Sequence, residues 1–118
     1  GMIVQADGEA LRRALWNLLD NAVKYSGNCR TVWVEVAREN NQCAILVRDR
    51  GLGISVEEQK RIFEKFARGA SSRAAGVKGT GIGLSMVEHI VRAHRGRITV
   101  ESESGRGSTF TILLPLVG

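Results

Sequence analysis

The chain has 118 residues, of which 43% are hydrophobic and 25% charged, and its net charge is +5. This is the balance of one ordinary globular domain, which we expect to span residues 2–116. The sequence excludes a membrane-spanning helix and shows no secretion signal, and the dispersed basic residues, without interleaved aromatics, disfavour nucleic acid as a partner.

Hydrophobic periodicity predicts a strand and then a long helix in the first part of the chain. Residues 2–6 are a strand candidate, and Asp7 can cap a helix that runs to about residue 26, where Gly27 ends it. The apolar positions of this helix follow the i, i+3, i+4 pattern: Leu11, Ala14, Leu15, Leu18, Leu19, Ala22 and Val23.

Two alternating segments follow this helix and are predicted to form a hairpin. They cover residues 31–38 and 42–49, with a turn at 39–42. In the second segment Cys43, Ile45, Val47 and Asp49 share one face. We interpret Cys43 and Cys29 as small core or near-surface residues of a reduced protein, because two cysteines are too few for a disulfide framework.

The second half of the chain alternates helices, a loop and strands. Ser55 and Glu58 form a capping box that opens a helix to about residue 66. Residues 67–80 lose all periodicity, which is typical of a functional or mobile loop. A third helix is predicted over 82–95.

A final hairpin completes the predicted fold. Its strands cover 97–102 and 108–115, joined by a turn at 104–107. The paired strands predict an α+β fold, a two-layer sandwich whose mixed, mostly antiparallel sheet of about five strands is covered on one face by three helices.

The first helix carries a group of polar residues beside its apolar stripe. Asn17, Asn21 and Lys24 fall within a wedge of about 60°, with Tyr25 between that wedge and the stripe. Two amide oxygens one turn apart can share a Mg²⁺ ion with substrate phosphates, and Lys24 can balance phosphate charge. Polar surface residues with incidental spacing are the alternative.

The segment DRGLGI, residues 49–54, places a carboxylate at the end of an alternating strand. The alternation points Asp49 inward, where an unpaired carboxylate is costly and needs a partner such as the exocyclic amine of a purine. Gly51 and Gly53 would let the backbone approach a flat ring. A simple Asp-initiated turn is the alternative.

The segment KGTGIGLS, residues 78–85, places three glycines directly before a helix. Bare amides of Gly79, Gly81 and Gly83 at a helix N-terminus form an anion site. The spacing is that of neither a Walker A loop nor a dinucleotide fingerprint, and a flexible linker is the alternative.

Together these segments resemble the four sequence boxes of the catalytic, ATP-binding domain of sensor histidine kinases. LWNLLDNAVKYS is similar to the N box, DRGLGI to the G1 box, IFEKFARG to the F box and GTGIGLS to the G2 box. The resemblance covers Val4 to Pro115. It places the chain in the GHKL class, which also includes gyrase and a heat-shock chaperone.

The resemblance implies a role for each matching residue in binding Mg²⁺ and ATP. Asn21 would be the principal Mg²⁺ ligand, with Asn17 assisting, and Lys24 and Arg68 would contact phosphate. The adenine end would be formed by Tyr25, Asp49, Gly51, Gly53, Ile54 and Ser108. Phe63 and Phe66 would anchor a lid over 67–80, and the phosphates would be held by Lys78, Gly79, Thr80, Gly81, Gly83 and Leu84.

Position 17 separates a kinase from an ATPase within this resemblance. GHKL ATPases carry a general-base glutamate four residues before the N-box asparagine, whereas this chain has Asn17. The resemblance therefore implies phosphoryl transfer to a histidine and not efficient hydrolysis; a nucleotide-binding switch module, or an ATPase without histidine phosphorylation, is the alternative.

The resemblance also implies partners and a location. The acceptor histidine would lie on the protein's own upstream dimerisation domain, since we interpret His89 as solvated and His94 as a satisfied residue at the core boundary. A response regulator would act downstream. We expect this part of the protein to be soluble and cytoplasmic, and the parent to be membrane-associated. Two departures from the family pattern are Arg50 in the G1 box and Arg95 where a glycine is usual.

Overall fold

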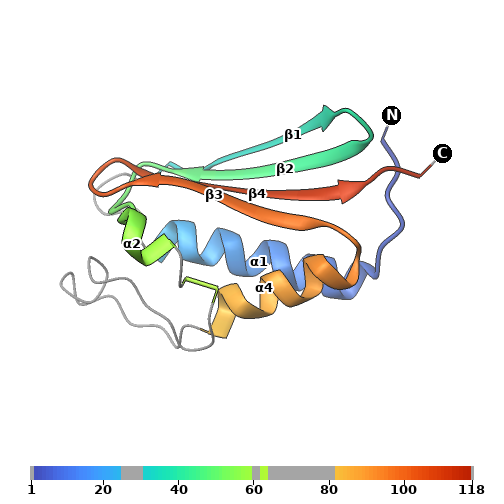
Figure 1. Ribbon diagram of the computed structural model, residues 1–118, viewed down its shortest axis with the longest axis horizontal. Coiled ribbons are helices and arrows are strands. Elements are labelled where there is room, and N and C mark those ends of the chain that lie inside the picture. Colours follow the sequence, from blue (N-terminus) through green and yellow to red (C-terminus); the bar gives the residue numbers. More distant parts are fainter. Residues whose placement is uncertain (1, 25–30, 60–61, 64–81, 118) are drawn as a thin grey trace.

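The computed structural model describes residues 2–24, 31–59, 62–63 and 82–117. Its sheet contains four strands in the order β1-β2-β4-β3, and all neighbours are antiparallel. The strands are β1 (Trp33–Glu39), β2 (Gln42–Asp49), β3 (Arg97–Glu103) and β4 (Gly107–Pro115). Two longer helices, α1 (Gly8–Lys24) and α4 (Ile82–Ala93), cover one face of this sheet (Figure 1). The predicted two-layer α+β class is confirmed.

The predicted strand at the N-terminus was wrong. Residues 2–6 have no regular secondary structure, so the described sheet has four strands instead of about five and is antiparallel instead of mixed. The segment is tied to the C-terminal end through a bond from the Val117 amide to the Ile3 carbonyl, at 2.8 Å. Ile3 is 70% exposed, so a strand with alternating side chains would bury little apolar surface here.

The second helix ends earlier than predicted. α2 covers only Val56–Gln59, and Ile62 and Phe63 lie in a turn. Ile62 is buried, and the ring of Phe63 meets Phe110 edge-on with centroids 6.4 Å apart. Contact with the core therefore holds Ile62 and Phe63. The Glu58 side chain and residues 64–66 lie outside the described part of the chain.

The core lies between the two longer helices and the sheet. The predicted stripe of α1 is buried at Ala14, Leu18 and Ala22, and Leu11, Leu15 and Leu19 pack against the same cluster. Val23 differs, because it is 64% exposed. At 100° per residue it lies about 140° from Leu18, beyond the reach of the sheet.

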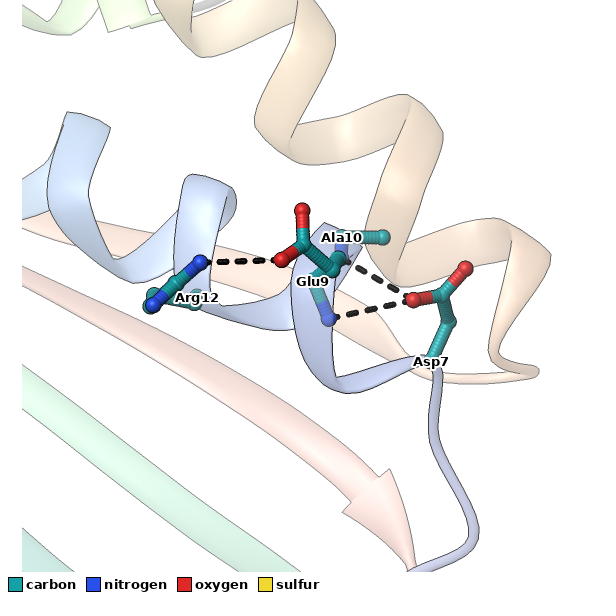
Figure 2. Close-up of polar contacts among 4 residues, drawn as sticks. All are labelled: Asp7, Glu9, Ala10 and Arg12. Carbon is teal, nitrogen blue, oxygen red and sulfur yellow. Dashed lines mark hydrogen bonds and ion pairs between the residues drawn. The ribbon is translucent and has the colours of Figure 1, made fainter.

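The start of α1 confirms Asp7 as its N-cap, as Figure 2 shows. The Asp7 Oδ1 atom accepts hydrogen bonds from the amides of Glu9, at 3.1 Å, and Ala10, at 3.2 Å. Arg12 pairs with Glu9 one turn into the helix, at 3.0 Å. The cap supplies acceptors for amides that have no partner within the helix.

His94 joins the end of α4 to the start of α1. Its Nε2 atom accepts a hydrogen bond from the Asp7 amide at 2.9 Å, and its Nδ1 atom lies 2.8 Å from the Ile90 carbonyl. Because Nε2 accepts, Nδ1 carries the proton and donates to Ile90. The prediction of a satisfied boundary histidine is confirmed, and His89 is exposed as predicted.

Helix α4 ends in a Schellman motif with an unusual residue. The Gly96 amide donates to the Val91 carbonyl and the Arg95 amide to the Arg92 carbonyl, both at 3.0 Å. Arg95 occupies the left-handed position with φ of 62°, where glycine is the usual residue. A Cβ atom at Gly96 would collide with the Leu113 carbonyl, so glycine is required only at that second position.

Replacing Arg95 by glycine should therefore stabilise the domain. We expect Arg95→Gly to raise the free energy of unfolding by about 0.5–1 kcal/mol, because the left-handed backbone no longer opposes a Cβ atom. Urea denaturation measures the change. Asn40→Gly is the matched control: Asn40 has φ of 56°, and asparagine already tolerates this conformation. An Arg95→Gly protein less stable than wild type would contradict the assignment.

Candidate functional site

The elements that carry the described members of the predicted site meet at one end of the molecule. α1 and α4 run in opposite directions beneath the sheet, so the end of α1 and the start of α4 lie together (Figure 1). The end of β2, the helix α2 and the turn between β3 and β4 lie at this same end (Figure 1). Both termini of the chain lie at the opposite end (Figure 1).

Asp49 is the buried charged group of this end. It pairs in register with Ser108 on β4, which in turn pairs with Ser102 on β3. The Asp49 side chain is only 6% exposed, as the alternation predicted. Its Oδ1 atom accepts a hydrogen bond from the Gly51 amide at 2.9 Å, and the Ser108 amide also donates to the carboxylate.

Burial raises the pKa of the Asp49 carboxyl above its ordinary value, and the two amide donors oppose this shift only in part. The carboxylate accepts hydrogen bonds while enclosed by protein. This is the environment in which an amine donor from a ligand is held most firmly, because water competes little.

The loop after Asp49 packs against the β3–β4 hairpin. Gly53 has φ of 70°, and a Cβ atom there would collide with the Glu103 carbonyl. The Gly105 amide donates to the Leu52 carbonyl at 2.7 Å. Glycine at position 53 thus serves a close approach to the protein's own backbone. Arg50 is directed elsewhere: its guanidinium lies 5.0 Å from the ring centroid of Trp33 on β1.

The two asparagines of α1 differ in what they already bind. Both are half-buried, at the edge of the core as the helical wedge predicted. Asn17 donates its side-chain amide to the Arg13 carbonyl at 2.9 Å, which leaves its Oδ1 atom as an acceptor. Asn21 makes no side-chain hydrogen bond with any other described residue. Lys24 pairs with Asp20 at 2.9 Å, on a half-exposed surface where such pairs contribute little stability.

The amide oxygens fit a magnesium ion that shares its ligands with phosphates. Magnesium prefers oxygen ligands and is usually held by one or two protein groups plus substrate. Within the described residues there is no cluster of three histidine, cysteine or carboxylate side chains that would hold a metal without a substrate. The Asn21 side-chain oxygen, which has no hydrogen-bond partner among the described residues, fits such a shared site.

The remaining predicted residues divide by what the structure describes. Ile54, Phe63 and Leu84 are partly buried against the core near this end. Gly83 lies in the first turn of α4, which begins at Ile82 as predicted. The other predicted ligands lie outside the described residues: Tyr25, Phe66, Arg68, Lys78, Gly79, Thr80 and Gly81. The free Cys43 is buried, and Cys29 lies outside the described residues.

Sequence reasoning missed two residues that hold this end together. Ser102 and Gln59 make five hydrogen bonds around the loop after Asp49, to Ile54, Gly107, Ser108 and each other. The alternation of β3 was the available signal for Ser102, because that residue shares the inward face of Ile98 and Val100. For Gln59, on a helix of four residues, the sequence carried no comparable signal.

Comparison with known proteins identifies the family. Residues 6–118 match the profile of the family described as histidine kinase-, DNA gyrase B-, and HSP90-like ATPase. The chain belongs to this family. It is 43% identical to the sensor-like histidine kinase SenX3 of Mycobacterium tuberculosis over 112 residues, which are 95% of this chain and 27% of that protein. It is 41% identical to the circadian input-output histidine kinase CikA of Synechococcus elongatus, over 96% of this chain and 15% of that protein.

Solved structures of histidine kinases share the fold. The mycobacterial sensor histidine kinase MprB superposes with a TM-score of 0.85 at 32% identity, covering 96% of this chain and 76% of that one. Full-length ShkA in complex with AMPPNP has a TM-score of 0.82 at 28% identity, covering 99% of this chain and 24% of that one. The chain spans about a quarter of the length of SenX3. None of the described helices is long and apolar enough to cross a membrane.

The buried carboxyl should leave a signature in the pH dependence of stability. Because the pKa of Asp49 is raised above 3.8, the folded protein holds this proton more tightly than the unfolded chain. The free energy of unfolding of wild type, relative to Asp49→Asn, should therefore fall as the pH rises above 3.8 until the folded carboxyl has ionised, and then stay level.

Urea denaturation at a series of pH values measures this difference. The Glu57→Gln variant, which removes an exposed carboxyl group from α2, is the control for the loss of one acidic side chain. A stability difference that moves in favour of wild type as the pH rises would contradict a pKa of Asp49 raised by burial.

Proposed function

We propose that this domain binds ATP with Mg²⁺ and donates the γ-phosphoryl group to a histidine on a separate dimerisation domain, as part of a two-component signalling system. The observation that carries the proposal is the buried Asp49 carboxylate, aligned with Ser108 and held by the Gly51 amide. The family match and the relatives named histidine kinases support it.

The adenine base would bind at Asp49. Its exocyclic amine donates to the carboxylate, while the loop 50–55 forms one wall beside the ring. Guanine presents a carbonyl oxygen at the corresponding position, and this oxygen would repel the carboxylate. A site that uses a buried charge in this way discriminates strongly, because the wrong base leaves that charge without its partner. ShkA, solved with the ATP analogue AMPPNP, supports nucleotide binding by this fold.

The phosphates would lie between the end of α1 and the start of α4. Asn21 would hold Mg²⁺ through its side-chain oxygen, with Asn17 contributing directly or through water. The metal, when bound, neutralises charge on the phosphates. Lys24 would exchange its contact with Asp20 for a phosphate oxygen, since a half-exposed ion pair is readily replaced. Arg68 and the glycine amides before α4 would complete the phosphate site.

Transfer to a histidine, and not hydrolysis, is favoured by Asn17. An amide does not take a proton from water, and Asn17 is tied to its own helix through the Arg13 carbonyl at 2.9 Å. Phosphoryl transfer depends mainly on positioning and on stabilisation of charge. In the transfer step the bond between the γ-phosphorus and its bridging oxygen breaks, a bond to an imidazole nitrogen forms, and ADP leaves.

The position of the termini constrains how an acceptor domain reaches the site. The N-terminus lies at the end of the molecule opposite the end of β2 (Figure 1). The 17 residues of α1 separate the two ends by roughly 25 Å at 1.5 Å per residue. A preceding domain that carries the histidine would therefore lie alongside this one, or donate to it from a second subunit. A response regulator would then receive the phosphoryl group.

Base selectivity tests the adenine end. We expect Asp49→Asn to lose most of the preference for ATP over GTP, because an amide no longer repels the guanine carbonyl and its NH₂ group can donate to it. Calorimetric titration with both nucleotides measures the ratio of the two affinities. Glu57→Gln, on the exposed face of α2, is the control. An unchanged preference in Asp49→Asn would contradict the role of the carboxylate.

Phosphoryl transfer tests the reaction. We expect the protein that includes its upstream dimerisation domain to incorporate acid-labile, alkali-stable label from γ-labelled ATP and Mg²⁺. Asn21→Ala should lower the rate by about 100-fold or more, because it removes the principal metal ligand. Asn41→Ala, in the exposed turn between β1 and β2, is the matched control.

The outcome distinguishes histidine phosphorylation from the two alternative functions. Tight ATP binding without any labelled histidine would contradict phosphoryl transfer and favour a nucleotide-dependent switch. Rapid release of inorganic phosphate without protein labelling would instead favour an ATPase.

A further inference from the structure

We propose that Ser102 and Gln59 are positioning residues of the nucleotide site. They hydrogen-bond to the backbone amide and the backbone carbonyl of Ile54, an arrangement that we call the clasp, and thereby set the selectivity of the site for the base. This inference rests on the proposed binding of adenine at Asp49. Neither residue touches the base in this account. Each acts through the loop 50–55, whose backbone follows directly from Asp49.

Ser102 holds the nitrogen side of Ile54. Its Oγ atom accepts a hydrogen bond from the Ile54 amide at 2.7 Å and donates one to the Gly107 carbonyl at 2.8 Å. The Oγ atom of Ser108 lies 2.7 Å away. Since the single proton of Ser102 is used on Gly107, Ser108 must be the donor in that contact. Ser102 thus makes all three hydrogen bonds available to a hydroxyl group.

This arrangement also fixes the Ser108 hydroxyl. Its proton is directed to Ser102, so Ser108 can offer only lone pairs to any further donor. The Ser108 backbone amide meanwhile donates to the Asp49 carboxylate. The backbone of Ser108 therefore binds Asp49 and its side chain binds Ser102, which links Ser102 on β3 to Asp49 on β2 across three neighbouring strands.

Gln59 holds the oxygen side of Ile54. Its side-chain NH₂ group donates to the Ile54 carbonyl at 2.9 Å and to the Ser102 carbonyl at 2.8 Å. Both protons of the amide are thereby used, and they join α2 to the loop and to β3. With its amide and its carbonyl both held, the Ile54 residue cannot shift without breaking two part-buried hydrogen bonds.

Such a clasp matters most for discrimination between bases. Selectivity depends on the guanine carbonyl meeting the Asp49 carboxylate without room to move aside, and the loop forms the adjacent wall. When the loop is released, the wrong base can tilt and water can enter. In the proposed site α1 and α4 bind the phosphates, so phosphate binding does not depend on the clasp.

The test compares three probes on the domain: ATP, GTP and inorganic triphosphate, each with Mg²⁺. We expect Ser102→Ala and Gln59→Met to lower the ratio of ATP affinity to GTP affinity by about tenfold, the effect of one part-buried backbone group left unpaired: the Ile54 amide in the first variant and the Ile54 carbonyl in the second. Affinity for inorganic triphosphate should stay within about twofold of wild type. Gln59→Met preserves the length and volume of the side chain without its donors. Ser104→Ala and Glu57→Gln, both exposed near the same loop, are the controls.

The outcomes separate a positioning role from a purely structural one. Variants with lowered Tm but the wild-type ratio of ATP to GTP affinity would overturn the clasp, and so would an equal loss of affinity for all three probes. A wild-type domain that binds ATP and GTP equally would instead overturn the proposed adenine site, and the clasp with it. Lowered selectivity with unchanged triphosphate binding supports both.

Discussion

The registration of β2, β4 and β3 is the constraint on which the site depends. It sets Asp49, Ser108 and Ser102 side by side on the face toward the helices. A slip of one residue between β2 and β4 would turn Asp49 outward and bring Arg48 into the core. The correct register is enforced by burial of Val47, Phe110 and Ile112 on the same face. The apolar core therefore fixes the position of the Asp49 carboxylate.

That carboxylate opposes the stability of the domain that carries it. Burial disfavours its charged form, and the two amides that donate to it only partly offset this cost. A buried acceptor without a full set of donors is what a ligand amine can complete. The stability lost at Asp49 and the selectivity proposed for the site thus have the same physical origin. Arg95 adds a second, unrelated cost at the far end of α4, where a left-handed backbone carries a side chain.

The sequence was sufficient for features that depend on local pattern. Alternation placed Asp49 inward, helical spacing placed Asn17 and Asn21 at the core boundary, and Asp7 was recognised as an N-cap from its position before the apolar stripe. Prediction from the sequence failed where tertiary contacts determine the local conformation. Residues 2–6 have the composition of a strand but little burial to reward it. Phe63 leaves the predicted helix because the sheet offers Phe110 as a partner.

Pattern alone did not show what lies against Gly53 within the protein itself. The sequence suggested that this glycine lets the backbone approach a flat ring, which stays a prediction, and gave no sign that it also makes room for the Glu103 carbonyl. Gln59 shows the same limit, because its contacts join segments 43 residues apart in the chain. Contacts of that kind follow from how β3 meets α2, and no local pattern records them.

Nucleotide titration of the domain followed by NMR tests the central claim most directly. If adenine binds at Asp49, adding ATP and Mg²⁺ will shift the amide resonances of Gly51, Ile54 and Ser108, while those of Val36 and Arg38 on β1 remain in place. AMP will shift the first group but not the side-chain amide of Asn21. Shifts confined to β1 or to the outer face of the sheet would contradict the account.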